Sequence, residues 1–263
     1  MSLEWNPQGY ARLQRRYQRQ YGLALIDRTL PYRPSPVGTL LDMGCGNGVL
    51  TNDFFGRLLP RPHRVIGVDR DTGMIAAARK RFGRRAAFTW HCRSLTDWIA
   101  QDRSLYDLIF SNAVLHWLDT LAALRSVLQW TALHLSRDGL FAFRYSLIGN
   151  AEAARDFLES QLRVFLRART LTLHRPVVSF AQSRAIMHDS GLDITNAEEI
   201  TGNPFDDDEQ HFQWMIYSQP LGRYLSKDQY ASFCAFLRAA WEKTPVRVAG
   251  HHGVFIGRRL ARR

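Results

Sequence analysis

The length and composition of the chain are those of one large folded domain, or of a core that carries a small lid. The chain has 263 residues, of which 46% are apolar, so it can bury a sizeable core. Its formal net charge of +11 favours acidic partners, but does not choose between nucleic acid, an acidic carrier protein and a carboxylate substrate. The three cysteines lie far apart, which argues against a disulfide framework and a zinc site.

No segment has the pattern of a membrane span or of a secretion signal. No apolar run approaches the ~20 residues that a membrane-spanning helix needs. The first residues lack the basic and then apolar layout of a signal peptide. We therefore expect a cytoplasmic protein that makes no membrane contact.

The first 30 residues carry a helical pattern. Tyr10, Leu13, Tyr17 and Tyr21 recur at helical spacing, with arginines on another face, which predicts an amphipathic N-terminal helix. Pro31 and the two prolines that follow it are expected to end this helix and to form a linker.

Strand and helix patterns then alternate as far as residue 145. A short apolar run of the strand type is followed each time by a longer run with helical spacing. This alternation indicates a parallel sheet with right-handed crossovers. The predicted strands are 39–43, 65–69, 86–91, 106–111 and 140–145, and the predicted helices are 50–59, 74–82 and 117–135.

The pattern changes after residue 145. Helices are predicted over 151–170, 181–190, 206–218 and 226–241, and strands over 192–200 and 253–258. The helices that do not fit the alternation are expected to form a lid over the carboxyl edge of the sheet, where ligands bind in open α/β folds. The predicted fold class is therefore α/β: a Rossmann-like, seven-stranded, mostly parallel sheet with helices on both faces and a helical lid.

A glycine turn follows the first predicted strand directly and opens a helix. Gly44, Gly46 and Gly48 allow the backbone to turn tightly and to approach a ligand without a Cβ in the way. The helix start beyond them offers unpaired N–H groups to an anion. The spacing is GxGxG rather than the GxGxxG of a pyrophosphate site, and a carboxylate suits such a helix start equally well.

Asp69 ends the second predicted strand, about 20 residues past the glycines, where an acidic side chain accepts hydrogen bonds from ribose hydroxyls. Met74, one helical turn further on, is placed to cover an adenine face. The alternatives for this turn are a flavin, a dinucleotide or no ligand, but strand, glycine turn, helix and acid occur here together and in order.

At these residues the sequence resembles the class I S-adenosylmethionine-dependent methyltransferases. Residues 41–48 are similar to their first motif, 65–71 to their second and 106–112 to the motif of their fourth strand. The resemblance implies S-adenosylmethionine as cofactor and three parts for the chain: a helix closing the site (1–30), a cofactor-binding core (31–145), and a completion of the sheet with helical lid insertions (146–263).

The resemblance also implies which residues line the donor site. The family usually has an acidic residue after the third strand, near the adenine amino group, whereas this chain has Cys92 or Arg93 there, with Asp97 as a substitute if the loop shifts. The implied donor-site residues are Asp42, Gly44, Cys45, Gly46, Asn47, Asp69, Arg70, Met74, Cys92, Arg93, Ser111 and Asn112.

Shorter similarities point to carboxylates as methyl acceptors. Residues 5–7 with Tyr10 resemble the start of trans-aconitate methyltransferases. A resemblance to malonyl-acyl carrier protein O-methyltransferases occurs at residues 18–20, 205–207 and 255–257, and at Ser111, Asn112, His116 and Trp117. Insect juvenile hormone acid methyltransferases share a His-Trp pair after the fourth strand. All three groups methylate carboxylates. Arg144 and Tyr145 stand where the second group tends to have small hydroxyl residues.

Methyl transfer from a sulfonium is an in-line displacement in which the protein supplies alignment and excludes water. A carboxylate is ionised at pH 7 and needs donors or cations to hold it, but no base. The candidates for holding it are Gln18, Arg19, Trp117 and Arg144. His116 is the one plausible base. No ligand spacing supports a metal site.

Several functions stay open. A hydroxyl or amine acceptor would employ His116 as base. The arginine excess allows an RNA methyltransferase, although no aromatic-interleaved RNA-binding motif occurs and nucleic acid is not the expected partner. A partner subunit that binds the donor without catalysis is a fourth reading. We favour a carboxyl O-methyltransferase acting on a malonyl-carrier thioester or a small organic acid, and the charge of the chain slightly favours the carrier-linked acid.

Overall fold

The computed structural model describes residues 18–173, 177–203, 205–219 and 221–261. The chain forms two compact units. One, the sheet unit, takes in residues 20–147, 177–199 and 252–261. The other, the helical unit, includes residues 148–173, 200–203, 205–219 and 221–251.

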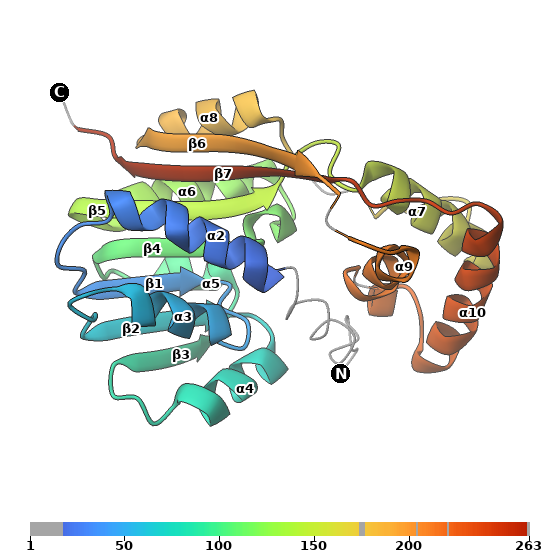
Figure 1. Ribbon diagram of the computed structural model, residues 1–263, viewed down its shortest axis with the longest axis horizontal. Helices are drawn as coiled ribbons and strands as arrows, with labels where there is room; N and C mark the ends of the chain where they lie inside the picture. Colours follow the sequence, from blue (N-terminus) through green and yellow to red (C-terminus); the bar gives the residue numbers. More distant parts are fainter. Residues whose placement is uncertain (1–17, 174–176, 204, 220, 262–263) are drawn as a thin grey trace. The chain divides into compact units, whose positions relative to one another are not determined.

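The sheet has seven strands in the order β3-β2-β1-β4-β5-β7-β6 (Figure 1). Strands β1 to β5 pair in parallel, and β7 runs antiparallel to β5. The chain order reverses between β1 and β4, which is where open α/β sheets bind ligands at the carboxyl ends of their strands. The strands are β1 (Thr39–Met43), β2 (Arg64–Asp69), β3 (Phe88–Cys92), β4 (Tyr106–Asn112), β5 (Leu135–Ser146), β6 (Leu192–Gly202) and β7 (Gly250–Arg259).

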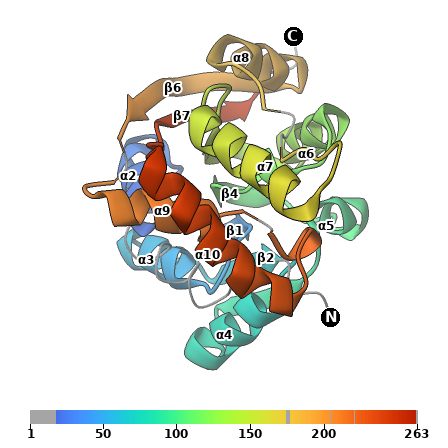
Figure 2. The same cartoon turned by 90° about the vertical axis from the view of Figure 1, so that its right-hand side faces the viewer.

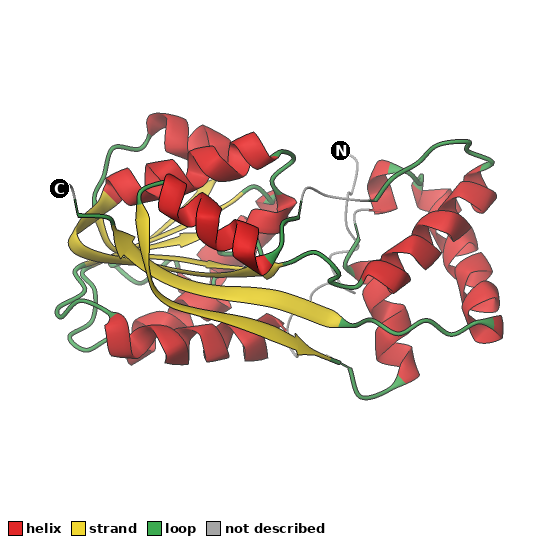
Figure 3. Ribbon diagram, turned by 90° about the horizontal axis from the view of Figure 1, so that it is seen from above, coloured by secondary structure: helices red, strands yellow, loops and turns green. Residues whose placement is uncertain are grey.

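Helices cover both faces of this sheet (Figures 1 and 3). Helices α2, α3 and α4 lie on one face, whereas α5, α6 and α8 lie on the other, where α6 packs against both of its neighbours. These helices are α2 (Arg19–Thr29), α3 (Val49–Arg57), α4 (Thr72–Phe82), α5 (Leu95–Gln101), α6 (Leu121–His134) and α8 (Phe180–Asp189), with short 3-10 helices η2 (Leu30–Tyr32) and η3 (Leu115–Trp117).

The core follows from the apolar character of the central strands. In β1 and β4 nearly every side chain is buried, as expected for parallel strands covered on both faces. Phe54 of α3 meets Phe110 of β4 with ring centroids 5.0 Å apart, and Phe143 of β5 stacks on Phe255 of β7 at 5.1 Å. Each such buried ring contributes about 1.5–3 kcal/mol to stability, which holds the strand ends in register.

The predicted seven-stranded, mostly parallel sheet with helices on both faces is confirmed, with three local corrections, whereas the lid over its carboxyl edge stays a prediction. The predicted helix 117–135 starts too early, because η3 turns the chain first and α6 starts only after Thr120, whose hydroxyl caps it. Strand β5 starts at Leu135, five residues before the predicted start, since its first residues pair irregularly with β4. Helix α5 was not predicted, because it is short and begins at a Ser94 cap.

The helical unit consists of α7 (Glu152–Leu166), α9 (Asp208–Tyr217), η4 (Leu221–Arg223) and α10 (Lys227–Lys243). Helices α7 and α10 lie side by side (Figure 2). Together with α9 they form a separate core that buries Leu158, Phe212 and Phe233. The acidic run at 206–209 caps and charges the start of α9, where Asp207 accepts a hydrogen bond from the Gln210 backbone N–H.

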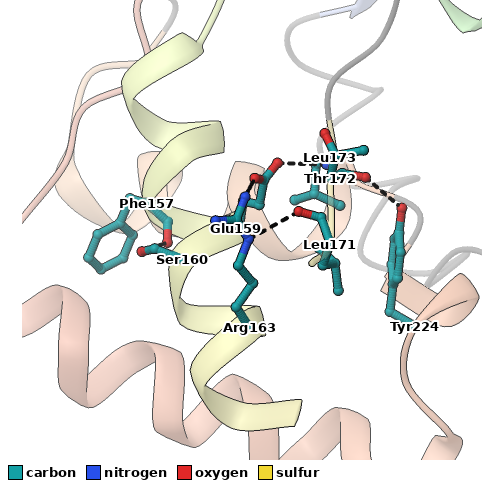
Figure 4. A network of polar contacts seen from close by, with 8 residues as sticks. All are labelled: Phe157, Glu159, Ser160, Arg163, Leu171, Thr172, Leu173 and Tyr224. Atoms are coloured by element: carbon teal, nitrogen blue, oxygen red, sulfur yellow. Dashed lines mark hydrogen bonds and ion pairs between the residues drawn. The ribbon is translucent and has the colours of Figure 1, made fainter. Parts of the chain in front are cut away.

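A polar network fastens the segment after α7 to the rest of this unit (Figure 4). The buried Glu159 carboxylate accepts hydrogen bonds from Arg163 and from the Leu173 backbone N–H. Arg163 also donates to the Leu171 carbonyl, and the Tyr224 hydroxyl donates to the Thr172 carbonyl. The network gives residues 171–173 a defined path in the absence of a helix or strand.

Candidate active site

The glycine turn begins where β1 ends, and backbone hydrogen bonds shape it. The N–H groups of Gly44 and Cys45 both donate to the Val68 carbonyl of β2, at 2.7 and 3.0 Å. Gly44 has φ +80°, and a Cβ placed there would lie 2.1 Å from Cγ2 of Val114. Only glycine fits at this position, because both the backbone angle and the space exclude a side chain.

The rest of the turn leads into α3. Gly46 and Gly48 have φ +54° and +74°, and a Cβ at Gly48 would lie 2.5 Å from the Trp90 ring. The side-chain oxygen of Asn47 accepts a hydrogen bond from the Val49 N–H at the first turn of α3. Burial raises the pKa of the Cys45 thiol, which therefore packs beneath the turn as a neutral group.

Asp69, at the end of β2, ties this turn to the next strand. One carboxylate oxygen accepts the Gly46 N–H at 2.8 Å, and the other accepts the Asp71 N–H at 2.9 Å. Burial raises the pKa of Asp69, while these two backbone donors oppose the rise. The glycine turn and the acid, 23 residues apart in sequence, thus form one structural element.

Asp42 lies below the turn and is almost completely buried. Its carboxylate accepts a hydrogen bond from the Thr51 hydroxyl of α3 at 2.6 Å. Burial raises the pKa of Asp42 to about 7, although the Thr51 hydrogen bond lowers it in part. The side chain joins β1 to α3 and so supports the turn from within the fold.

The remaining predicted donor-site residues surround the ends of β2 and β3. Arg70 is exposed, and Met74 is half-buried in the first turn of α4, whose N-cap is Asp71. Cys92 is exposed, and the Arg93 N–H donates to the Asp69 carbonyl at 2.9 Å.

Asp97, the suggested substitute for the missing acid after β3, lies at the start of α5. Its carboxylate accepts a hydrogen bond from Ser94, and its N–H donates to the Ser94 hydroxyl at the start of α5. Both bonds stabilise the helix start, and a contact of Asp97 with the adenine amino group stays a prediction.

A second group of side chains gathers at the ends of β4 and β5. The Ser111 hydroxyl donates to the Met43 carbonyl at 2.9 Å and joins β4 to β1. Asn112 lies opposite Arg144 in the β4–β5 pairing, and its side-chain oxygen accepts the Arg144 Nε–H at 2.9 Å. Adjacent strands lie about 4.8 Å apart, so the Arg144 backbone is about two strand spacings from the glycine turn.

Arg144 is a buried cation, with only 3% of its surface exposed. Its guanidinium carbon lies 4.7 Å from the centroid of the Tyr21 ring of α2, a cation–π contact. The neighbouring Gly22 lets α2 approach closely, since a Cβ there would lie 3.1 Å from the Asn112 amide nitrogen. Helix α2 therefore helps to fix the guanidinium at this edge.

His116 and Trp117 lie in η3, which follows a tight turn at the end of β4. The turn passes through Ala113, a non-glycine residue at φ +60°, and the Ala113 N–H donates to the Arg144 carbonyl at 2.8 Å. The rings of His116 and Trp117 are 5.6 Å apart. His116 Nδ1 accepts a hydrogen bond from the Ser146 N–H at 3.3 Å.

Comparison with known families agrees with this geometry. A family described as methyltransferase domain matches residues 40–139, the span from β1 to the start of β5. Residues 40–139 form a class I S-adenosylmethionine-dependent methyltransferase domain.

The chain is also similar to curated methyltransferases with named acceptors. It is 35% identical to a malonyl-[acyl-carrier protein] O-methyltransferase of Bacillus cereus over 105 residues, 40% of this chain and 36% of the relative. It is 32% identical to a trans-aconitate 2-methyltransferase of Variovorax paradoxus over 116 residues, 44% of this chain and 41% of the relative. The matches span less than half the length of these relatives.

A solved methyltransferase has the same fold. The Haemonchus contortus phosphoethanolamine N-methyltransferase 2 in complex with S-adenosyl-L-methionine gives a TM-score of 0.57 at 17% identity, covering 92% of this chain and 53% of that one. At this identity the likeness concerns the fold alone.

The predicted donor-site residues lie at or next to the carboxyl ends of β1 to β4. His116 and Trp117 follow β4, and Arg144 lies near the end of β5, beyond the matched span. Gln18 is half-buried and immediately precedes α2, and its role as a carboxylate ligand stays a prediction. The similarity seen at residues 5–7 and Tyr10, and the first part of the predicted N-terminal helix, lie outside the described residues.

Sequence reasoning missed the side chains that orient these groups. Tyr21 was noted only as part of a helical stripe, and Val114, Ser146 and Trp90 carried no motif at all. Among the described residues no group of three or more His, Cys, Asp or Glu side chains could hold a metal ion. Nor does that part of the chain contain a helix long and apolar enough to cross a membrane.

Proposed function

We propose that this protein transfers the methyl group of S-adenosylmethionine to an ionised carboxylate, on a malonyl-carrier thioester or on a small organic acid. The observation that carries the proposal is the buried guanidinium of Arg144, held at the same sheet edge as the glycine turn. Arginine keeps its charge at all working pH values, so this edge holds a permanent cation.

The chemistry of the donor side suits S-adenosylmethionine. Gly44, Gly46 and Gly48 give the turn positive φ angles, so its backbone can approach a ligand closely, and the start of α3 suits the carboxylate of that ligand. Asp69 is positioned to accept ribose hydroxyls with the lone pairs that its two backbone donors leave. S-adenosylmethionine supplies a methyl group already activated on a sulfonium. A solved structure with this fold holds that compound.

The acceptor side of the site suits an anion that accepts hydrogen bonds. Arg144 supplies charge and N–H donors, and Trp117 supplies an indole N–H on an apolar wall. A carboxylate is already ionised at pH 7, so these groups need only hold one oxygen towards the methyl group. A protonated amine would instead be repelled by the buried cation.

The named acceptors of the relatives are consistent with this choice. Malonyl and aconitate groups both carry carboxylates, although the similarity covers only part of each relative. The high positive charge of the chain would attract an acidic carrier protein at low ionic strength, which favours a carrier-linked acid.

The test is incubation with methyl-labelled donor and a panel of acceptors: malonyl-carrier protein, free malonate, aconitate, and matched alcohols and amines. A carboxyl enzyme produces label that is released by mild base, as expected of a methyl ester. Stable label on an alcohol or amine, with none on any acid, would refute the proposal. Label on free acids alone would remove the carrier-linked acceptor but keep the reaction class.

A further inference from the structure

One ring nitrogen of His116 is occupied by the backbone. Nδ1 accepts the N–H of Ser146, the last residue of β5, at a distance of 3.3 Å. This contact links the segment that follows β4 to the end of the neighbouring strand, so it belongs to the part of the fold that forms the acceptor side.

The backbone holds both partners of this hydrogen bond in place. Ser146 pairs with His252 in the antiparallel β5–β7 ladder, which fixes the position of its N–H. His116 follows the Ala113 turn, which the Ala113 N–H fastens to the Arg144 carbonyl at 2.8 Å. The His116 ring is therefore oriented by two strands rather than by its own helix.

The contact decides which nitrogen carries the proton. A neutral imidazole has one N–H and one lone pair, and a nitrogen that accepts a backbone N–H must contribute the lone pair. The proton of His116 then resides on Nε2. A general base needs a free lone pair, yet Nδ1 has committed its lone pair and Nε2 has none to offer.

We infer that His116 is a hydrogen-bond donor for the methyl acceptor, through its Nε2–H, and not a general base. The inference rests on the proposed function, because a carboxylate only accepts hydrogen bonds and gains from such a donor. His116, the Trp117 indole and the Arg144 guanidinium then all offer hydrogen-bond donors to the methyl acceptor. This set of donors selects an ionised oxygen acceptor over a hydroxyl, which must lose a proton to a base.

Two substitutions distinguish a hydrogen-bond donor role of His116 from a general base role. In His116→Gln the side-chain amide nitrogen can replace Nε2–H as a donor, but a glutamine cannot take up a proton at pH 7. His116→Ala removes both abilities. With the best acid of the panel, we expect His116→Gln to keep kcat/KM within about threefold of the parent, and His116→Ala to lose about 30-fold, the usual cost of a lost hydrogen bond to a charged group.

Both variants should bind S-adenosylmethionine as the parent protein does, which calorimetry would verify. Equal losses of kcat/KM in the Gln and Ala variants, with unchanged affinity for S-adenosylmethionine and unchanged melting temperature, would overturn the role of His116 as a hydrogen-bond donor. Such a result would indicate a general base instead.

The tautomer can be read without any acceptor. In protein labelled with 15N-histidine, long-range proton–nitrogen correlations distinguish the two neutral forms, and the His116→Ala spectrum assigns the signal. We expect the Nε2–H form, with an unprotonated Nδ1. An Nδ1–H form in the parent protein would overturn the inference even if acids are methylated, whereas a lack of acid methylation with the Nε2–H form present would refute the proposed function instead.

Discussion

The carboxyl edge of the sheet has a donor half, at the ends of β1 and β2, and an acceptor half, at the ends of β4 and β5. Different groups position the two halves. On the donor half, backbone groups of β1 and β2 do most of the positioning: Gly44 and Cys45 donate to Val68, and Gly46 donates to Asp69. On the acceptor half, side chains do it: Asn112 orients Arg144, and Tyr21 of α2 stacks against the guanidinium.

The difference affects how freely each half can change. A site shaped by backbone tolerates few substitutions, because its angles and close approaches demand glycine. A site shaped by side chains can acquire another specificity through a few exchanges on an unchanged scaffold. We therefore expect substitutions on the donor half to weaken binding of S-adenosylmethionine, and those on the acceptor half to affect the use of the acceptor alone.

The largest effect is expected from Gly44→Ala. The new Cβ would meet Val114 at 2.1 Å and would force a non-glycine residue to φ +80°. Affinity for S-adenosylmethionine, measured by titration calorimetry, should fall at least about 100-fold. The matched control is Gly56→Ala in α3, where a Cβ meets nothing within 4 Å. The control should bind normally and gain about 0.5–1 kcal/mol in stability. Normal binding by Gly44→Ala would show that the turn does not form the donor site.

Arg144→Met should cause the next largest effect. It should lower activity towards the acid but leave the affinity for S-adenosylmethionine nearly unchanged. It retains an apolar stem but loses the charge and the hydrogen bond to Asn112. We expect kcat/KM for the preferred acid to fall about 50-fold while donor affinity stays within threefold, roughly as for other lost charged hydrogen bonds. Arg137→Met, an exposed position near the start of β5, should leave both quantities unchanged. A large loss of donor affinity in Arg144→Met would contradict the separation of the halves.

A smaller effect on donor affinity is expected for Asp69→Asn. The amide offers one acceptor oxygen where the carboxylate offers two, so one of the two backbone N–H groups at Gly46 and Asp71 loses its partner. Calorimetry should show affinity reduced about tenfold. Asp71→Asn is the control, because asparagine caps helices as well as aspartate does. Parent-like affinity in Asp69→Asn would remove the acid from the donor site.

The smallest effect on activity is expected at Asp42, where the change should appear in stability. Its pKa of about 7 in the folded protein exceeds that of the unfolded chain, so the folded state keeps a proton that the unfolded state loses between about pH 4 and 7. Stability from this group is present at low pH and declines as the pH rises through this window, by up to about 1.4 kcal/mol per pH unit.

Asp42→Asn should therefore make the free energy of unfolding depend less steeply on pH in that range. Urea denaturation at a series of pH values measures the slope. Identical slopes for the variant and the parent protein would show that Asp42 is ionised in the fold, contrary to the effect of its burial.

The strands of the sheet could be predicted from the sequence because short, local residue patterns determine where a strand begins and ends. Residues 39–43 appear as β1 with the predicted bounds, and β2 and β4 differ by one residue at one end. Apolar runs bounded by turn residues make such strands recognisable. The helix 117–135 was misjudged because its apolar spacing continues through η3, and only the turn at Ala113 shows that the chain changes direction there.

The glycine turn and Asp69 were likewise determined by the sequence, because motif spacing along β1 and β2 encodes backbone angles and a strand end. The sequence named His116, Trp117 and Arg144 as candidates on the acceptor half, but only the tertiary structure decided how their side chains are held. The meeting of Tyr21, Asn112, Arg144, His116 and Ser146 joins residues up to 125 positions apart, and no periodicity records contacts between side chains on separate elements. The tautomer of His116 is the clearest case, because it depends on one N–H at the end of a neighbouring strand.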